Sequence, residues 1–312
     1  MRQRGLANDA GLLWALSAEI PSKAIARSRM ISPVLFALAA LLCFGLGDFI
    51  YKWAAGAGLR TDHFLMAQAW VFCPLIILYA LATGTLVFIP AVLWGSLAGI
   101  FIFAALYCFI ASLTSGAIST NASIFRLNFI VTAALVILVL REPLGAGKIV
   151  GLGLALTATW LLVGGGEKAA PGRSMRGGLV QVAIATVLFG AANFFHTIGL
   201  RSGAVPESLV AAQAALFMPL ATVVVFIAHR KLSPPRGTFR FAAPAAILLL
   251  VATVCMLRGV AGGQASVLVP IAQMGFVIAA VLGIFVLRES VTWRKTGGLL
   301  AAFAALAVLA LS

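Results

Sequence analysis

The chain has 312 residues, of which 62% are hydrophobic and 10% are charged, and its mean hydropathy is +1.11. About a quarter of the residues in a typical soluble domain are charged, so this composition excludes an ordinary soluble protein. The formal net charge is +14, but the basic residues lie in loops and at the ends of apolar blocks, without interleaved stacking aromatics. This distribution argues against a nucleic-acid partner.

Residues 1–32 form an N-terminal extension that carries several charges and differs from the rest of the chain. Glu19, Pro21 and Lys23 interrupt any apolar core of a signal peptide. Two interpretations remain open. The segment GLLWALSAEI (11–20) is a short helix on the membrane surface, or translation starts at Met30 and the extension is an artefact of the assigned start.

After the extension, the chain consists of apolar blocks of about 20 residues, which is long enough for a helix to cross a bilayer. Backbone polar groups must be paired within each block in lipid, so every block is predicted to be a helix. The predicted spans are residues 33–53, 64–83, 91–111, 117–140, 147–164, 179–200, 207–229, 241–260, 264–287 and 295–311. A polar linker, 165–178, divides them into two five-helix halves, 33–164 and 179–311.

The two halves repeat one another in sequence. A shift of 145 residues carries Gln68 onto Gln213, and a shift of 147 residues carries the Val-Leu-Arg-Glu of 139–142 onto that of 286–289. Because each half has an odd number of spans, the second half must enter the membrane from the opposite face. The predicted fold class is therefore an all-α polytopic membrane protein with ten transmembrane helices in two inverted repeats, an arrangement typical of secondary transporters.

Several motifs resemble a known family. FGLGDF (44–49) and FGAANF (189–194) resemble its first-helix motif. The segment SVLVPIAQMGFVIAAVLGIFVLRE (266–289) resembles its fourth-helix pattern, with a proline in mid-helix and a glutamate at the end. The family is the drug/metabolite transporter superfamily, EamA type, and the resemblance covers residues 33–311. Pro270 has Ser123 as its counterpart, so a kink in the first-half helix stays an open question.

Charged side chains inside a span are candidate functional sites because lipid disfavours them. Arg126 lies about ten residues into its span, near the midplane at about 1.5 Å per residue, and its repeat counterpart is Gln273. A guanidinium binds carboxylate or phosphate with two parallel hydrogen bonds, so we predict contact with a polar or anionic substrate. The alternative is that Arg126 pairs with Asp48 and only holds helices together. The predicted substrate-binding residues are Arg126, Gln273, Asn128, Asn193, Phe129 and Phe276.

Two residues are candidates for proton coupling. Asp48 is the only acidic residue well inside a predicted span, and burial favours the protonated form of a carboxylate. Lys52, four residues on, offers the alternative of a structural ion pair. His196, one helical turn from Asn193, is the second candidate, and its alternative is a hydrogen-bonded structural histidine.

The repeated Val-Leu-Arg-Glu ends a span in each half. Acidic and basic groups at such a position are typical of helix caps or gates, and we expect Lys148 and Lys295 among their partners. The predicted gate or helix-end ion-pair residues are Arg141, Glu142, Arg288 and Glu289.

These patterns predict secondary transport, without ATP, of a small polar metabolite, outward and by alternating access, driven by protons or by the substrate gradient. A flippase for a lipid-linked head group on the same fold is the alternative. There is no zinc-ligand His/Glu pair, nucleophile turn or phosphate loop, so we expect no enzyme, metal or cofactor. The expected partners are a small-molecule substrate and the lipid bilayer, with the chain as a monomer.

The resemblance implies a bacterial inner-membrane protein with both termini in the cytoplasm. Under that topology, Lys and Arg are more numerous outside than inside, which is contrary to the positive-inside rule.

An alkaline-phosphatase fusion at Ser312 tests this topology. The fused enzyme folds to its active form only when exported, so a cytoplasmic C-terminus predicts an inactive fusion in whole cells. Periplasmic activity would show that the C-terminus lies on the other side of the membrane.

Overall fold

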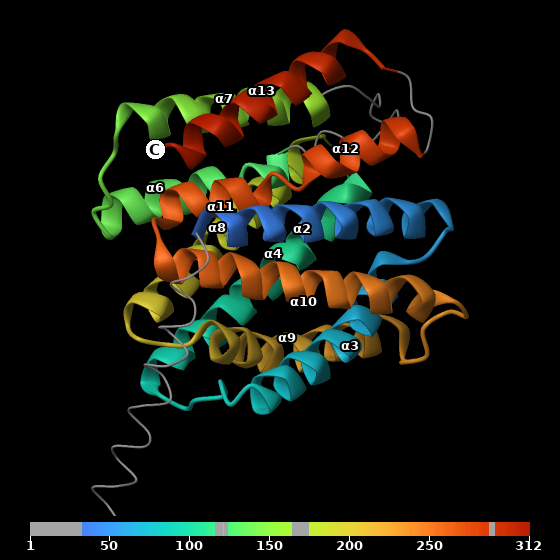
Figure 1. The fold of residues 1–312 in the computed structure, drawn as a ribbon. Coiled ribbons are helices and arrows are strands. Elements are labelled where there is room, and N and C mark those ends of the chain that lie inside the picture. The colour runs from blue at the N-terminus through green and yellow to red at the C-terminus, as the bar shows by residue number, and fades with distance from the viewer. Residues whose placement is uncertain (1–32, 116–120, 122–123, 164–174, 287–290) are drawn as a thin grey trace, which may run out of the picture.

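The computed structural model describes residues 33–115, 121, 124–163, 175–286 and 291–312, which form a bundle of helices (Figure 1). The first half contains α2 (Pro33–Gly56), α3 (Thr61–Ala82), the 3₁₀ turn η1 (Pro90–Val92), α4 (Leu93–Ser115), α6 (Asn128–Val139) and α7 (Ala146–Val163). The second half contains α8 (Met175–Arg201), α9 (Pro206–His229), α10 (Thr238–Gly262), α11 (Ala265–Gln273), α12 (Phe276–Phe285) and α13 (Trp293–Ala310). The N-terminal extension, most of the linker, Arg288 and Glu289 lie outside the described residues.

Eight of the described helices are long and apolar enough to cross a membrane. Two further apolar helices, Ile124–Val139 and Ala146–Leu162, are shorter. The prediction of an all-α polytopic membrane protein is confirmed. The number of ten spans and the inversion of the halves stay predictions, since residues 117–120 and 122–123 of the predicted fourth span are among those not described.

The side chains are distributed as in a membrane protein, with small residues inside and large apolar residues outside. Alanines 37, 40, 67, 98, 155 and 192 are fully buried, whereas Leu138 is 76% exposed and Phe303 is 59% exposed. Lipid solvates the large apolar side chains as well as a protein core does, while small residues allow helices to approach closely. The exposed apolar surface is therefore the face toward lipid.

Pro33 and Ser312, the two ends of the described chain, lie at the same end of the bundle (Figure 1). A Cβ added to Gly263 would lie 3.3 Å from the Cβ of Pro33, and one added to Gly147 would lie 3.0 Å from the Cβ of Ser312. We call this the terminal end. The other, where α3 begins and α9 ends, is the opposite end.

The first helix of each half packs against the fourth helix of the other half. A Cβ added to Gly45 in α2 would lie 2.5 Å from the carbonyl oxygen of Gly275, between α11 and α12. A Cβ added to Gly190 in α8 would lie 2.8 Å from the carbonyl oxygen of Asn128 in α6. Gly190 and Gly275 are the repeat counterparts of Gly45 and Asn128, so the same backbone approach occurs twice.

The fourth helix of each half is interrupted at matching positions. The N–H of Met274 donates to the carbonyl of Ile271 at 3.2 Å, and the N–H of Leu127 donates to that of Ile124 at 3.0 Å. These bonds span three residues, as in a 3₁₀ turn, and a turn of this kind interrupts the α-helical ladder. Because the first half has no proline matching Pro270, the interruption does not depend on proline.

Replacing Gly190 with Val should destabilise the protein. The new Cβ would meet the Cβ of Val131 at 2.5 Å and the Asn128 carbonyl at 2.8 Å, and overpacking of this kind costs about 1–3 kcal/mol. Thermal unfolding in detergent measures the change. Gly153→Val, in α7 with nothing within 4 Å of its Cβ, is the matched control. Equal melting temperatures for the two variants would contradict the close approach.

Candidate functional site

Asp48 and Arg126 form an ion pair within the membrane-spanning region. Arg126 Nη2 lies 2.5 Å from Asp48 Oδ2, and the two side chains are 26% and 15% exposed respectively. The contact is not aligned as a hydrogen bond, since Asp48 Oδ2 has no hydrogen-bond partner among the described residues. Asp48 follows Gly45 by nearly one turn, and Arg126 directly precedes the interruption at Leu127. The side chain of Lys52, the other candidate partner, lies outside the part of the chain that is described.

Phe125, the neighbour of Arg126 in the sequence, packs against two other aromatic rings. Phe125 stacks on Phe109 with 4.4 Å between ring centroids and meets the edge of Phe189 at 5.2 Å. Phe189 begins the repeated FGAANF motif, whereas the repeat did not single out Phe109 or Phe125, because aromatic residues are common throughout the spans. Phe129 and Phe276, the predicted lining residues, are both buried in one hydrophobic cluster.

Several buried polar atoms lack a hydrogen-bond partner among the described residues. They include Asn128 Oδ1, Asn193 Nδ2, and the ring nitrogens of His196 with Oε1 of Gln213, two side chains that lie close enough to interact with each other. Each of these four side chains belongs to a residue that is at most 9% exposed. Buried polar atoms without partners are uncommon in native proteins and indicate a place for water, an ion or a ligand.

The repeat counterparts of the ion pair are placed differently. Asn193 in α8 corresponds to Asp48, and Gln273 at the end of α11 corresponds to Arg126. Both are buried, at 3% and 8% exposure. None of the hydrogen bonds between described residues joins Asn193 to Gln273, so the contact between Asp48 and Arg126 has no matching hydrogen bond in the described part of the second half. Gln68, the repeat counterpart of Gln213, makes a hydrogen bond between helices, since its Nε2 donates to Tyr51 Oη at 2.6 Å.

At the terminal end, the carboxylate of Glu142 joins the two halves. Arg201 Nη2 donates to Glu142 Oε1 at 2.5 Å. The backbone N–H groups of Ala265 and Ser266 donate to Oε1 and Oε2 at 3.2 and 3.0 Å, and Ser266 Oγ donates to Oε2 at 2.6 Å. Ala265 and Ser266 begin α11, so a negative charge caps the positive end of that helix. Arg141, the predicted partner next to Glu142, is exposed.

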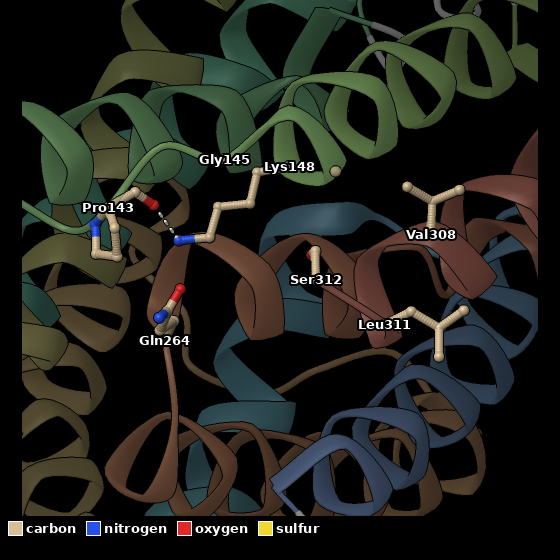
Figure 2. A pocket seen from close by; sticks show the side chains of 8 residues that line it. Pro143, Gly145, Lys148, Gln264, Val308, Leu311 and Ser312 are labelled. Carbon is tan, nitrogen blue, oxygen red and sulfur yellow. Dashed lines mark hydrogen bonds between the residues drawn. The ribbon is translucent and has the colours of Figure 1, made fainter.

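Lys148 connects this network to a cavity, which Figure 2 shows at the terminal end. Its Nζ donates to the carbonyl of Pro143 at 2.6 Å and to Ser266 Oγ at 2.9 Å. The cavity has a volume of about 480 Å³ and is also lined by Gly145, Gly147, Gln264, Val308, Leu311 and Ser312. It lies where α7 and α11 begin and α13 ends, and neither Asp48 nor Arg126 lines it.

A second buried carboxylate ties other helices together at the same end. Arg258 Nε donates to Glu207 Oε1 at 2.7 Å, and Arg258 Nη2 donates to Tyr79 Oη at 3.1 Å. The Glu207 side chain is 2% exposed. The contact joins α9, α10 and α3. Arg258 and Glu207 stand 51 residues apart in the sequence, so no sequence pattern indicated this pair.

Comparisons with known proteins agree with this architecture. Residues 176–311 match the model of the EamA-like transporter family, which confirms the predicted resemblance over the second half of the chain. One solved crystal structure aligns with a TM-score of 0.75 and 17% sequence identity, covering 89% of this chain and 98% of that chain. At this identity the likeness shows a shared fold. No curated protein matches the chain.

Replacing Glu142 with Ala should lower the free energy of unfolding substantially. It removes the cap of α11 and leaves Arg201 without its partner. We expect a loss of about 2–4 kcal/mol, less than for a fully buried pair because the Arg201 side chain is 43% exposed. Thermal unfolding in detergent measures the loss.

Arg141→Ala is the control for that variant, since it changes the exposed neighbour in the same turn. In a double-mutant cycle, Glu142→Ala and Arg201→Ala should together cost less than their sum. Additive effects, or a loss no larger than that of Arg141→Ala, would show that the network contributes no stability.

Proposed function

We propose that this membrane transporter of the drug/metabolite type moves a small anionic metabolite without ATP, by alternating access around Arg126. The Asp48–Arg126 ion pair carries the proposal. Ionisable residues inside the membrane usually mark the path of a substrate or an ion. This pair also lies beside the interrupted fourth helix, and discontinuous helices form the binding sites of many secondary transporters.

The guanidinium of Arg126 has capacity for a substrate as well as for Asp48. It has five N–H donors in a planar fork, and its contact with Asp48 is made by Nη2. A carboxylate or phosphate group on a substrate can bind this fork with two hydrogen bonds. The anion then competes with Asp48 for the same positive charge.

The competition offers a mechanism for proton coupling. When the substrate anion binds the guanidinium of Arg126, Asp48 loses the positive charge that balanced its own in a poorly solvated site. A carboxylate in that position takes up a proton, because its charged form is disfavoured by desolvation. The anion and the proton therefore bind together, and the loaded site carries the same net charge as the empty one.

The unpaired polar atoms supply further contacts to the substrate. Asn128 follows Arg126 by two residues, and Asn193, His196 and Gln213 extend the buried polar surface over α8 and α9. We include Gln273 because it is the counterpart of Arg126. The rings of Phe109, Phe125 and Phe189 would form an apolar wall beside the guanidinium.

The two ion pairs at the terminal end hold the transporter closed at that face. Glu142 with Arg201 joins the two halves, and Arg258 joins α10 both to Glu207 in α9 and to Tyr79 in α3, while Arg126 keeps partial exposure. In the opposite conformation these contacts would separate, and the repeat assigns the corresponding gate to Arg288 and Glu289. We also propose that transport is outward. In this proposal the protein is a monomer in the bacterial inner membrane, with both termini in the cytoplasm. The common position of Pro33 and Ser312 agrees with termini on one side.

Thermal-shift screening of the purified full-length protein against a metabolite library tests the proposal, because a ligand stabilises the folded state that it binds. Anionic metabolites should raise the melting temperature. Arg126→Ala should weaken binding of the best ligand by about 10- to 100-fold, the value of a hydrogen-bonded charge. Asp48→Asn should bind the same ligand more tightly than wild type and without dependence on pH, because the internal competitor is gone.

Arg240→Ala, an exposed arginine at the start of α10, is the matched control and should leave binding unchanged. The same variants are then compared for transport in proteoliposomes. Normal binding and transport by Arg126→Ala would refute the site. A ligand that binds Asp48→Asn with the wild-type pH dependence would refute the coupling step alone.

A further inference from the structure

We infer that Asp62, His63 and His229 form a binding site for one transition-metal ion of the Zn²⁺ or Ni²⁺ class, which joins α3 to α9 at the opposite end of the bundle. Each residue offers one ligand atom, and these atoms all lie within 4.8 Å of one another. The inference does not depend on the proposed transport function, since it concerns other residues and is tested by metal binding.

The fold brings these ligands together from distant parts of the chain. Asp62 and His63 lie in the first turn of α3, and His229 is the last residue of α9. His63 Nδ1 lies 3.1 Å from Asp62 Oδ1, and His229 Nε2 is in contact with Asp62 Oδ2. The two imidazole rings stack with 4.8 Å between their centroids. In the sequence, the histidines are scattered over different segments and gave no sign of this cluster.

The chemistry of the three groups suits a transition metal. Zinc binds imidazole nitrogen and carboxylate oxygen at about 2.0–2.2 Å, so its ligand atoms stand about 3.4 Å apart in a tetrahedral site. The observed separations approach this value, and two imidazoles favour zinc, nickel or copper over magnesium and calcium. The Asp62, His63 and His229 side chains are 28%, 9% and 21% exposed. An ion can therefore enter from water and keep a water molecule as its fourth ligand.

The electrostatic surroundings include both favourable and competing charges. His229 ends α9, and the carbonyl end of a helix attracts cations. Arg60 competes, because its Nη2 lies 3.1 Å from Asp62 Oδ2 and 2.9 Å from His229 Nε2. Arg230 and Lys231 follow His229 but are exposed, where water and salt screen their charge.

Although Arg60 competes with a metal ion, its contact with His229 also indicates that a cation fits at this position. His229 Nε2 faces a donor, Arg60, and an acceptor, Asp62, yet one ring nitrogen either carries a proton or offers a lone pair. A metal ion removes this conflict, because Nε2 and Oδ2 both donate electron pairs to it. The Arg60 side chain is 58% exposed, so it can move into solvent when the ion binds.

Equilibrium dialysis of the purified full-length protein against Zn²⁺, after removal of any histidine tag, tests the inference. Wild type should bind one Zn²⁺ per chain. His229→Gln and Asp62→Asn should each weaken binding by at least about tenfold, the lower limit seen even for outer-shell partners of a metal. His196→Gln, which changes a buried histidine elsewhere, should keep the stoichiometry and affinity of Zn²⁺ binding.

Arg60→Gln separates a metal site from a purely structural cluster. If the cluster binds metal, loss of the competing guanidinium tightens Zn²⁺ binding about two- to fivefold, the equivalent of one exposed charge pair. If the cluster is only a salt-bridge network, this variant binds no Zn²⁺ and melts at a lower temperature. Absence of Zn²⁺ binding in wild type and Arg60→Gln, or full binding in both ligand variants, overturns the inference.

Discussion

The architecture depends on two close approaches of backbone to backbone, where Gly45 meets Gly275 and Gly190 meets Asn128. In lipid, helices associate through tight packing and hydrogen bonds, because apolar burial gives no preference for a neighbouring helix over an acyl chain. Each contact joins a first helix to the interrupted fourth helix of the other half. Together they set the depth at which Asp48 and Arg126 meet.

Negative charge is scarce in this chain, and its placement is selective. Eight acidic residues face 22 Lys and Arg. Among the described residues, every carboxylate side chain contacts an arginine: Asp48 with Arg126, Asp62 with Arg60, Glu142 with Arg201, and Glu207 with Arg258. Arginine suits this use because its planar fork matches a carboxylate and because it is less strongly hydrated than lysine. The basic excess therefore includes residues that hold helices together as well as residues that face the membrane surface.

Much of the fold, but only part of the candidate site, could be predicted from the sequence. Blocks of about 20 apolar residues predict helices because lipid permits few other structures, and residues 176–311 match the expected family. Asp48 was foreseen as one partner of Arg126, since both are charges within spans. The contact of Arg201 with Glu142 and that of His229 with His63 were not predicted. Hydropathy and repeats do not show which residues face one another on helices that are far apart in the sequence. The interruption at Leu127 also had no local sign, as it occurs without proline.

The turn at Leu127 separates Arg126 from α6. Arg126 directly precedes this joint, and Asn128 directly follows it as the first residue of α6. Bending at the joint changes the separation of the guanidinium from the amide, and it also moves the end of α6, which leads into Glu142. The shape of the binding surface and the closure of the terminal end therefore change together. A ligand that fits one shape of the surface also selects the face of the membrane to which the site opens.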